Sequence, residues 1–179
     1  MARYIAFLRA INVGGHTVKM EHLRVLFAEL GFLEVATFIA SGNVIFEAPA
    51  ENARAREERI EAHLGQALGY DVATFVRSLS ELAAVLDYRP FPAAEFDTAG
   101  ATLSIAFLRG PPAAAAVARL GTFRSPVNDF RARGREIYWL CHGRTSESGF
   151  SGALLEKTIG MPATLRNVNT LRGIAAKYA

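Results

Sequence analysis

The hydrophobic and polar positions of the chain follow a pattern that changes period several times and then repeats. Tyr4–Leu8 is apolar at every position, which is typical of a strand covered on both faces. An apolar stripe at helical spacing follows, formed by Met20, Leu23, Phe27 and Leu30. Gly31 comes directly after the stripe and can take the left-handed conformation that closes a helix. The opening therefore predicts a strand followed by a helix.

The next segments predict a hairpin, a second helix and a further strand. Two short runs rich in strand-forming residues, Val35–Ile39 and Val44–Phe46, flank the turn residues Ser41-Gly42-Asn43. Glu51–Leu68 has a helical apolar face and is followed by Gly69, and Val72–Val76 again reads as a strand. The order β-α-β-β-α-β is that of the ferredoxin-like unit.

The second half of the chain repeats this order. Ala6-Phe7-Leu8-Arg9 returns as Ala106-Phe107-Leu108-Arg109 at the start of the strand Leu103–Leu108. The elements predicted after it are a helix over Ala113–Leu120 ended by Gly121, a hairpin of Val127–Arg133 and Arg135–Cys141 around Gly134, a helix from Phe150 to Ile159 ended by Gly160, a strand over Ala163–Arg166, and a last helix capped by Asn169. Two similar halves are therefore expected.

Between the halves, Ser78 and Glu81 have the spacing of a capping box and predict a short helix. Tyr88–Ala101 contains Pro90, Pro92 and Gly100 without periodicity, as a linker does. The predicted fold class is α+β, with two tandem ferredoxin-like (βαββαβ) subdomains packed together, plus linker and C-terminal helices. The predicted boundaries are 1–88, 89–101 and 102–179. We expect the free face of each sheet to be covered by the other half, or by these extra helices.

Composition and charge narrow the function only slightly. Of the 20 basic residues, 17 are arginine, and the net charge of +3 is small for a dedicated nucleic-acid-binding protein. No apolar run approaches the ~20 residues of a membrane helix, so we expect no membrane association. The apolar run between Arg3 and Arg9 is too short for a secretory signal, and Cys141 is the single cysteine. We therefore expect a cytoplasmic location.

Three segments carry a resemblance to a known family. They are Phe7-Leu8-Arg9-Ala10-Ile11-Asn12-Val13-Gly14-Gly15, Ser41-Gly42-Asn43-Val44-Ile45-Phe46 and Ala163-Thr164-Leu165-Arg166-Asn167. In this order along the chain they resemble the signature segments of the bacterial domain-of-unknown-function family numbered 1697. The resemblance implies a two-subdomain α+β fold and no particular activity. The chain departs from the family pattern at Ala10, where the family usually has glycine, and at Val168, where it usually has an aromatic residue.

Polar and glycine residues gather at one predicted strand end of the first half. Gly14 and Gly15 can turn backbone N–H groups toward one point at a helix N-terminus, and the predicted topology brings Asn43 toward the segment after the first strand. The first hypothesis is therefore a site for a small anionic ligand bearing phosphate or carboxylate. Its predicted residues are Arg9, Asn12, Gly14, Gly15, Lys19, Ser41, Asn43, Arg166 and Asn167. Turn and cap chemistry alone also explains Ser41, Gly42, Asn43, Asn167 and Asn169.

Two other functions stay open at this point. A ferredoxin-like RNA-binding or single-stranded nucleic-acid-binding module would need exposed aromatic rings, for which Tyr4, Phe7 and Phe46 are candidates. Arg131, Arg133 and Arg135 at the second hairpin tip form a basic prong that suits a nucleic-acid backbone or a solvated strand edge. Alternatively, the motifs serve only the fold of a structural or protein-interaction domain.

Motifs for catalysis and metal binding are absent from the sequence. It contains neither H-E-x-x-H nor G-x-S-x-G, and its four histidines have no ligand spacing. Cys141 lies in an apolar run and is expected to be a buried small hydrophobe. The mixed Arg and Glu residues of 54–61 read as a solvated helix face. We expect no cofactor and no metal, and the sequence leaves enzymatic activity and oligomeric state open.

Overall fold

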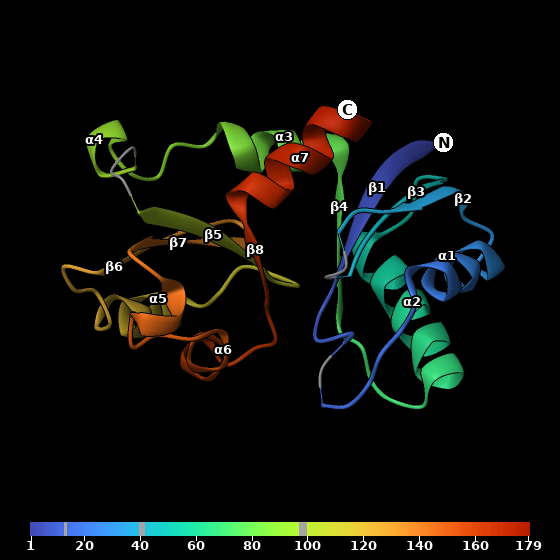
Figure 1. The fold of residues 1–179 in the computed structure, drawn as a ribbon, viewed down its shortest axis with the longest axis horizontal. Helices are drawn as coiled ribbons and strands as arrows, with labels where there is room; N and C mark the ends of the chain where they lie inside the picture. Colours follow the sequence, from blue (N-terminus) through green and yellow to red (C-terminus); the bar gives the residue numbers. More distant parts are fainter. Residues whose placement is uncertain (13, 40–41, 97–99) are drawn as a thin grey trace. The chain divides into compact units, whose positions relative to one another are not determined.

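The computed structural model covers residues 1–179 and describes all of them except 13, 40–41 and 97–99. The chain forms two compact units, which are described separately below (Figure 1). The first comprises Met1–Ala83 together with Ala179, and the second comprises Ala84–Tyr178. The predicted linker 89–101, as far as it is described, belongs to the second unit.

The first unit is a four-stranded antiparallel sheet with two helices on one face (Figure 1). Its strand order is β2-β3-β1-β4, the order of a ferredoxin-like unit. The elements are β1 (Ala2–Leu8), α1 (Met20–Glu29), β2 (Leu33–Thr37), β3 (Asn43–Ala48), α2 (Ala53–Leu68) and β4 (Thr74–Ser78). A further helix, α3 (Leu79–Asp87), begins in this unit and ends in the second.

Alternation along β1 divides its side chains between two buried faces. Ala6 and Leu8 face α1 and α2, where Phe46 of β3 stacks on Phe32 with ring centroids 4.3 Å apart. Ile5 and Phe7 point to the opposite face and are also buried. The continuous apolar run of β1 is thus explained by burial on both sides, which confirms the prediction from the sequence.

Two carboxylates of α2 accept hydrogen bonds from backbone N–H groups of β4, the edge strand of the first sheet. Oε1 of Glu57 accepts a hydrogen bond from the Val76 backbone N–H at 2.9 Å, and Oε1 of Glu61 accepts one from Thr74 N–H at 2.9 Å. β4 is the edge strand of the sheet that the structure describes, so these N–H groups pair with the carboxylates and not with a further strand of that sheet. Glu57 is only 1% exposed, so the prediction of a fully solvated face over 54–61 is wrong at this residue and at Arg56, which is equally buried.

The second unit repeats the architecture of the first. Its strand order is β6-β7-β5-β8, and α5 and α6 cover one face of the sheet (Figure 1). The elements are α4 (Ala93–Phe96), β5 (Ala101–Phe107), α5 (Ala114–Gly121), β6 (Asn128–Arg133), β7 (Glu136–His142), a short 3-10 turn η1 (Thr145–Glu147), α6 (Gly152–Ile159), β8 (Thr164–Asn167) and α7 (Val168–Tyr178).

The internal repeat extends to strand register. Ile5 lies opposite Arg77 in the first sheet, and Ile105 lies opposite Arg166 in the second. In the second sheet, Ala106, Trp139 and Cys141 point toward the helices, whereas Leu103, Ile105 and Tyr138 point the other way. The end of α3, the segment that follows it up to residue 93, and helix α7 cover this second face within the unit. The predicted fold class is thus observed in both units.

Helix ends were predicted with mixed success. The capping box is confirmed, since Glu81 N–H donates to Ser78 Oγ at 3.1 Å and Ser78 N–H donates to Glu81 Oε2 at 2.7 Å. Gly31, Gly69 and Gly160 have positive φ, as a helix-closing glycine should. Gly121 is the last residue of α5, where the sequence predicts the helix to end, but its φ is not positive. The error concerns Asn169, which lies inside α7 and donates its backbone N–H to the preceding Asn167 Oδ1.

Ala10 follows β1 with φ of 55°, in the left-handed region that disfavours a Cβ atom. We expect Ala10→Gly to raise the free energy of unfolding by about 1 kcal/mol, because glycine removes this steric cost. Urea denaturation followed by circular dichroism measures the change. Ala176→Gly, on the exposed surface of α7, should have the opposite sign, since glycine weakens an ordinary helix by about 1 kcal/mol. A destabilised Ala10→Gly variant would contradict the strain at this position.

Candidate functional site

The structure forms the strand-end corner that the sequence predicts, but it uses the two asparagines there for internal bonds. Asn43 lies opposite Phe7, and Leu8 N–H donates to Gly42 O at 2.8 Å. The Asn43 side chain is 0% exposed and donates from Nδ2 to the Phe38 carbonyl at 2.9 Å. Asn43 therefore holds the hairpin together. Ser41, which the sequence also assigns to this corner, lies outside the described residues.

The loop after β1 is fastened to the body of the first unit. Asn12 Oδ1 accepts from Val18 N–H at 2.8 Å, and Tyr70 donates from its hydroxyl to the Ile11 carbonyl at 2.9 Å. The ring of His16 stacks on Tyr70 with centroids 3.9 Å apart. Gly14 and Gly15 both have positive φ, with open space where a Cβ would stand. Their turn is thus a backbone requirement of the loop.

The charged residues predicted for the site are spread over both units. Arg9 is half-buried and continues the pairing of β1, because its N–H donates to Ala73 O at 2.9 Å. Lys19 is exposed and directly precedes α1. Arg166 and Asn167 belong to the second unit. Their membership of one site with the corner stays a prediction.

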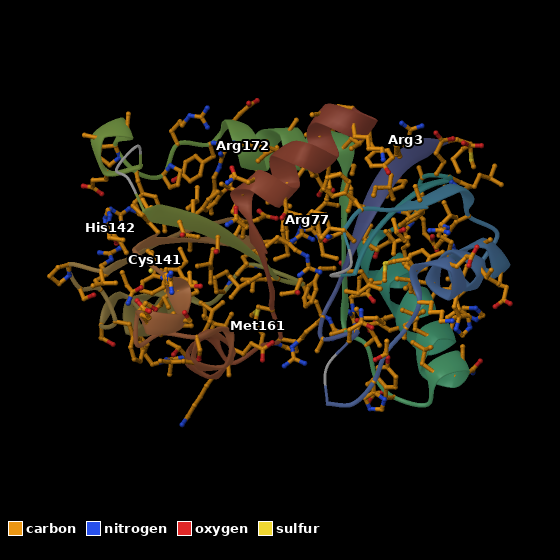
Figure 2. All side chains as sticks on the ribbon, viewed as in Figure 1. Arg3, Arg77, Cys141, His142, Met161 and Arg172 are labelled. Atoms are coloured by element: carbon orange, nitrogen blue, oxygen red, sulfur yellow. The ribbon has the colours of Figure 1, made fainter. Side chains whose placement is uncertain are left out.

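Arg166 is a buried cation of β8. Its Nη1 donates to Thr164 Oγ1 at 2.7 Å and to the Leu165 carbonyl at 2.9 Å. Burial lowers the pKa of Arg166 to about 10, because removal from water disfavours the charged form. Arg77, its repeat counterpart in β4 (Figure 2), is buried as well and donates to the Val76 carbonyl. These contacts fit a structural role for both arginines.

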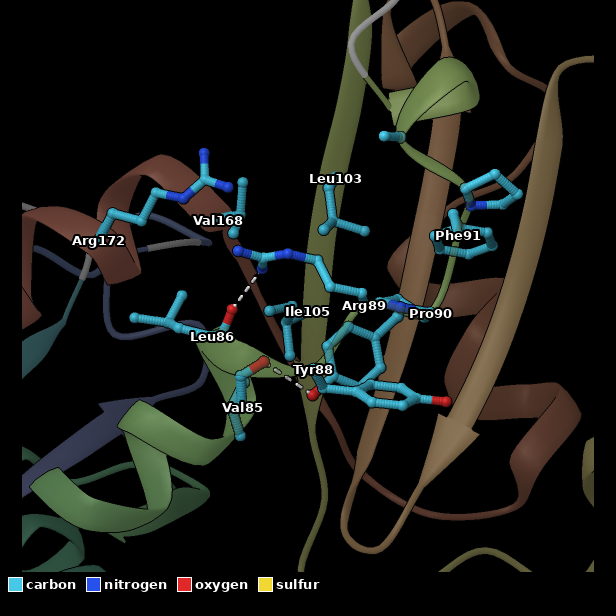
Figure 3. Close-up of a pocket in the computed structure, with 13 residues that line it drawn as sticks. Val85, Leu86, Tyr88, Arg89, Pro90, Phe91, Leu103, Ile105, Val168 and Arg172 are labelled. Atoms are coloured by element: carbon cyan, nitrogen blue, oxygen red, sulfur yellow. Dashed lines mark hydrogen bonds between the residues drawn. The ribbon is translucent and has the colours of Figure 1, made fainter.

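A cavity of about 640 Å³ lies in the second unit, on the sheet face opposite α5 and α6. This volume is within the range of small-molecule sites. We name it the strap cavity, because the non-helical segment Tyr88–Pro92, here called the strap, forms one wall (Figure 3). Its lining residues are Val85, Leu86, Tyr88, Arg89, Pro90, Phe91, Pro92, Ala93, Leu103, Ile105, Tyr138, Val168 and Arg172.

One end of the strap cavity is cationic. Val168 and Arg172 are four residues apart on α7 and therefore share a helix face. Arg89 Nη1 donates to the Leu86 carbonyl at 2.8 Å, which fixes its side chain over the end of α3. Figure 3 shows the guanidinium groups of Arg89 and Arg172 on the side of Val168. Among the described residues that line the cavity, none is acidic.

The other end is aromatic. Tyr88 meets Tyr138 edge to face, with ring centroids 5.1 Å apart and planes at 64°. The Tyr138 hydroxyl donates to the Val85 carbonyl at 3.1 Å. Burial raises the pKa of Tyr138 above its usual value, with a further contribution from the nearby Glu136 carboxylate, so this phenol stays a neutral donor at ordinary pH. Phe91 completes this end and is itself buried.

Two arginines of the second hairpin hold the strap in place. The Arg133 guanidinium lies 4.4 Å from the Tyr88 ring centroid, and that of Arg131 lies 5.1 Å from the Phe91 ring centroid. Arg131 also pairs with Asp129 at 2.7 Å. Two members of the predicted basic prong thus contact the protein's own strap and strand. The sequence did not predict this site, because Tyr88–Ala101 has the composition of a linker, although its aromatic residues beside two prolines are typical of a rigid, packed segment.

Of the three aromatic residues proposed for nucleic-acid stacking, two are fully buried in the first unit and one is partly covered. Phe7 and Phe46 are both 0% exposed. Tyr4 is half-buried, and the Arg56 guanidinium lies 3.9 Å from its ring centroid. The nucleic-acid hypothesis therefore loses the support of these three rings.

Comparison with known proteins identifies the family. A family profile described as "Protein of unknown function (DUF1697)" matches residues 1–138. The chain belongs to the DUF1697 family. The match ends at Tyr138, so Ala163–Asn167 and α7 lie beyond it. Of the two departures from the family pattern, Ala10 has positive φ and Val168 lines the strap cavity.

One solved structure extends the likeness of this DUF1697 protein to the whole fold. It is that of a conserved bacterial protein from Streptococcus pneumoniae, with a TM-score of 0.75 and 21% identity. The similarity covers 98% of this chain and 97% of that chain. No curated protein matches the sequence significantly. At this identity the likeness shows a shared fold.

Other candidate chemistry in the DUF1697 protein is sparse. Within the part of the chain that the structure describes, no three His, Cys, Asp or Glu side chains are arranged to hold a metal ion. Cys141 is buried in β7 (Figure 2), and burial raises the pKa of its thiol, as expected for an unreactive cysteine. None of the described helices has the length and apolar character needed to cross a membrane.

Proposed function

We propose that this protein binds a small ligand with one anionic group and an apolar body in the strap cavity. The ligand class is that expected from the sequence, whereas the site moves from the corner of the first unit to the second unit. The observation that carries the proposal is that the described lining of the cavity combines two arginines with an apolar floor and contains no acidic residue. A cytoplasmic location remains proposed, on the basis of the single, buried, unpaired cysteine.

Charge supports this choice of ligand. A guanidinium has five N–H donors in a planar fork that fits carboxylate and phosphate oxygens. The bond to Leu86 O uses one donor of Arg89. Because Arg89 and Arg172 come from different elements, they can approach an anion from two directions. Both residues are exposed, and their positive charge favours an anionic ligand over a cationic one.

The internal bonds at the corner of the first unit also favour the strap cavity. The Asn12 side chain accepts a hydrogen bond of 2.8 Å from the Val18 backbone N–H. The Asn43 side chain donates one of 2.9 Å to the Phe38 carbonyl. A ligand at the corner would compete with these bonds. The strap cavity instead offers apolar surface from Leu103 and Ile105 beside its charges.

The two sites can be separated by removing one charge from each. We expect 2-naphthoate or octanoate to bind the wild-type protein, and Arg172→Gln to weaken binding about tenfold, since a charged hydrogen bond contributes about 1.5–3 kcal/mol. Lys19→Gln, a matched change beside the corner, should leave affinity unchanged. Isothermal titration calorimetry at fixed salt measures the dissociation constants.

Each outcome of this comparison is informative. Loss of binding in Lys19→Gln with retention in Arg172→Gln would move the site back to the corner. Binding of neither anion to the wild-type protein would contradict the proposal. A second variant, Val168→Trp, fills the cationic end with a large side chain and should block binding, while urea denaturation checks that the second unit still folds.

A further inference from the structure

We infer that the ligand of the strap cavity is a flat aromatic carboxylate. This inference rests on the proposed function and adds the shape and chemistry of the apolar body. Three features of the cavity carry it: an apolar floor beside a wall that contains two prolines, an aromatic end that favours ring contacts, and the scarcity of hydrogen-bonding groups other than the arginines.

The floor and one wall of the cavity are apolar and conformationally restricted. Leu103 and Ile105 are two residues apart on β5, so both point out of the same face of the sheet. The strap faces them with Pro90 and Pro92, whose rings fix φ and limit movement of the wall. A planar ring system fits between a pleated sheet and a rigid wall with little loss of conformational freedom. A flexible aliphatic chain would lose more freedom on binding there.

The aromatic end favours a ring over saturated carbon. Tyr88 is half-buried, whereas Tyr138 is only 1% exposed, so Tyr88 is the aromatic surface that a ligand meets first. Its ring is held by Arg133 and by the edge contact with Tyr138. An offset or edge-to-face contact between two rings adds about 0.5–1.5 kcal/mol beyond simple area burial. Tyr88 is therefore positioned to discriminate between aromatic and aliphatic bodies.

The scarcity of polar lining groups argues against a nucleotide. Among the described lining residues, there is no Asn, Gln, Asp, Glu, Ser or Thr side chain to pair with the polar edge of a nucleobase. Pro90 and Pro92 also lack backbone N–H donors. An unpaired buried amine or ring nitrogen costs about 1–3 kcal/mol. A hydrocarbon ring has no such groups, and its carboxylate can reach Arg89 and Arg172.

A matched set of probes tests the inference in the full-length protein. The set contains 2-naphthoate, its saturated analogue decalin-2-carboxylate, the uncharged 2-naphthylmethanol and adenosine monophosphate. We expect 2-naphthoate to bind roughly fivefold tighter than the decalin acid, from ring contacts alone. The alcohol should bind at least tenfold more weakly than 2-naphthoate, because it cannot pair with the two arginines. Isothermal titration calorimetry in one buffer gives all four constants.

A variant of the wall links the preference to one side chain. Tyr88→Leu keeps apolar bulk but removes the ring, and it should bring the affinity for 2-naphthoate down to that for the decalin acid. Phe123→Leu removes a partly exposed ring of the same unit outside the cavity and should leave the ratio of the two affinities unchanged. The ratio of the two affinities is diagnostic, because a general loss of structure would weaken the binding of both acids to the same extent.

The possible failures are distinguishable. Equal affinities for 2-naphthoate and the decalin acid would overturn the aromatic inference and leave the proposed function standing. Tightest binding of adenosine monophosphate would overturn the inference in favour of a nucleotide. If none of the anions binds, the proposed function itself fails.

Discussion

Replacing Glu57 by alanine is expected to lower the free energy of unfolding by about 3 kcal/mol. Its carboxylate is buried and accepts from Val76 N–H at 2.9 Å, at the outer edge of the first sheet. Alanine leaves that N–H without its acceptor and leaves Arg54, 3.7 Å from the carboxylate, with one fewer partner. Urea denaturation followed by far-ultraviolet circular dichroism measures the loss.

The neighbouring Glu58 provides the control. It is exposed and pairs with Arg54 at 2.9 Å, and surface pairs of this kind contribute at most about 0.5 kcal/mol. Glu57→Gln keeps an oxygen acceptor for Val76 and should cost less than Glu57→Ala. Equal, small effects of Glu57→Ala and Glu58→Ala would show that the buried carboxylate does not stabilise the strand edge.

The architecture was predictable because periodicity reports burial directly. A run such as Tyr4–Leu8, apolar on both alternating sets, requires a strand covered on two sides. The repeated Ala-Phe-Leu-Arg segment then placed β1 and β5 in equivalent positions, and both are inner strands of their sheets. The capping box of Ser78 and Glu81 was readable because both partners are local in sequence.

Features that depend on tertiary contacts could not be read in this way. Glu57 stands among charged residues on α2, and only its position beside β4 makes it a buried acceptor. Gly121 ends α5, as the alanine-rich run before it predicts, yet without the left-handed conformation of the other helix-closing glycines. Sequence spacing does not reveal which face of a helix meets a strand edge. The charge of these α2 residues therefore led to the prediction that they are exposed to solvent.

In the candidate site, too, features set by strand order were predictable, whereas features set by tertiary contacts were not. The geometry of the corner was predictable, since strand order alone brings Asn43 beside β1. The use of the Asn12 and Asn43 side chains for internal bonds was not, because both contacts span a loop. The strap cavity combines residues from 85 to 172, and no local motif connects Tyr88 with Tyr138 or Arg89 with Arg172. Only the assembled second unit brings them to one cavity.

Replacing Asn128 by alanine is expected to lower the free energy of unfolding of the second unit by about 2–4 kcal/mol. Asn128 is buried, accepts from the Trp139 indole N–H at 2.9 Å, and donates to the Ser148 carbonyl at 2.9 Å. Alanine leaves the buried indole donor of Trp139 without its acceptor, at about 1–3 kcal/mol, and also removes the donor to the carbonyl of the half-buried Ser148. Because Trp139 is the single tryptophan, its fluorescence follows unfolding of this unit during urea denaturation.

A double-mutant cycle isolates the indole bond from the rest of the effect. In a Trp139→Phe background the donor is already absent, so Asn128→Ala should cost less there, by a coupling of about 1 kcal/mol. Circular dichroism replaces fluorescence as the probe in that background. Asn169→Ala, on the exposed surface of α7, serves as the matched asparagine control and should change stability by less than about 0.5 kcal/mol. If Asn128→Ala lowers the free energy of unfolding by the same amount in the Trp139→Phe background, the predicted coupling is wrong. The contribution of Asn128 would then come from its bond to the Ser148 carbonyl.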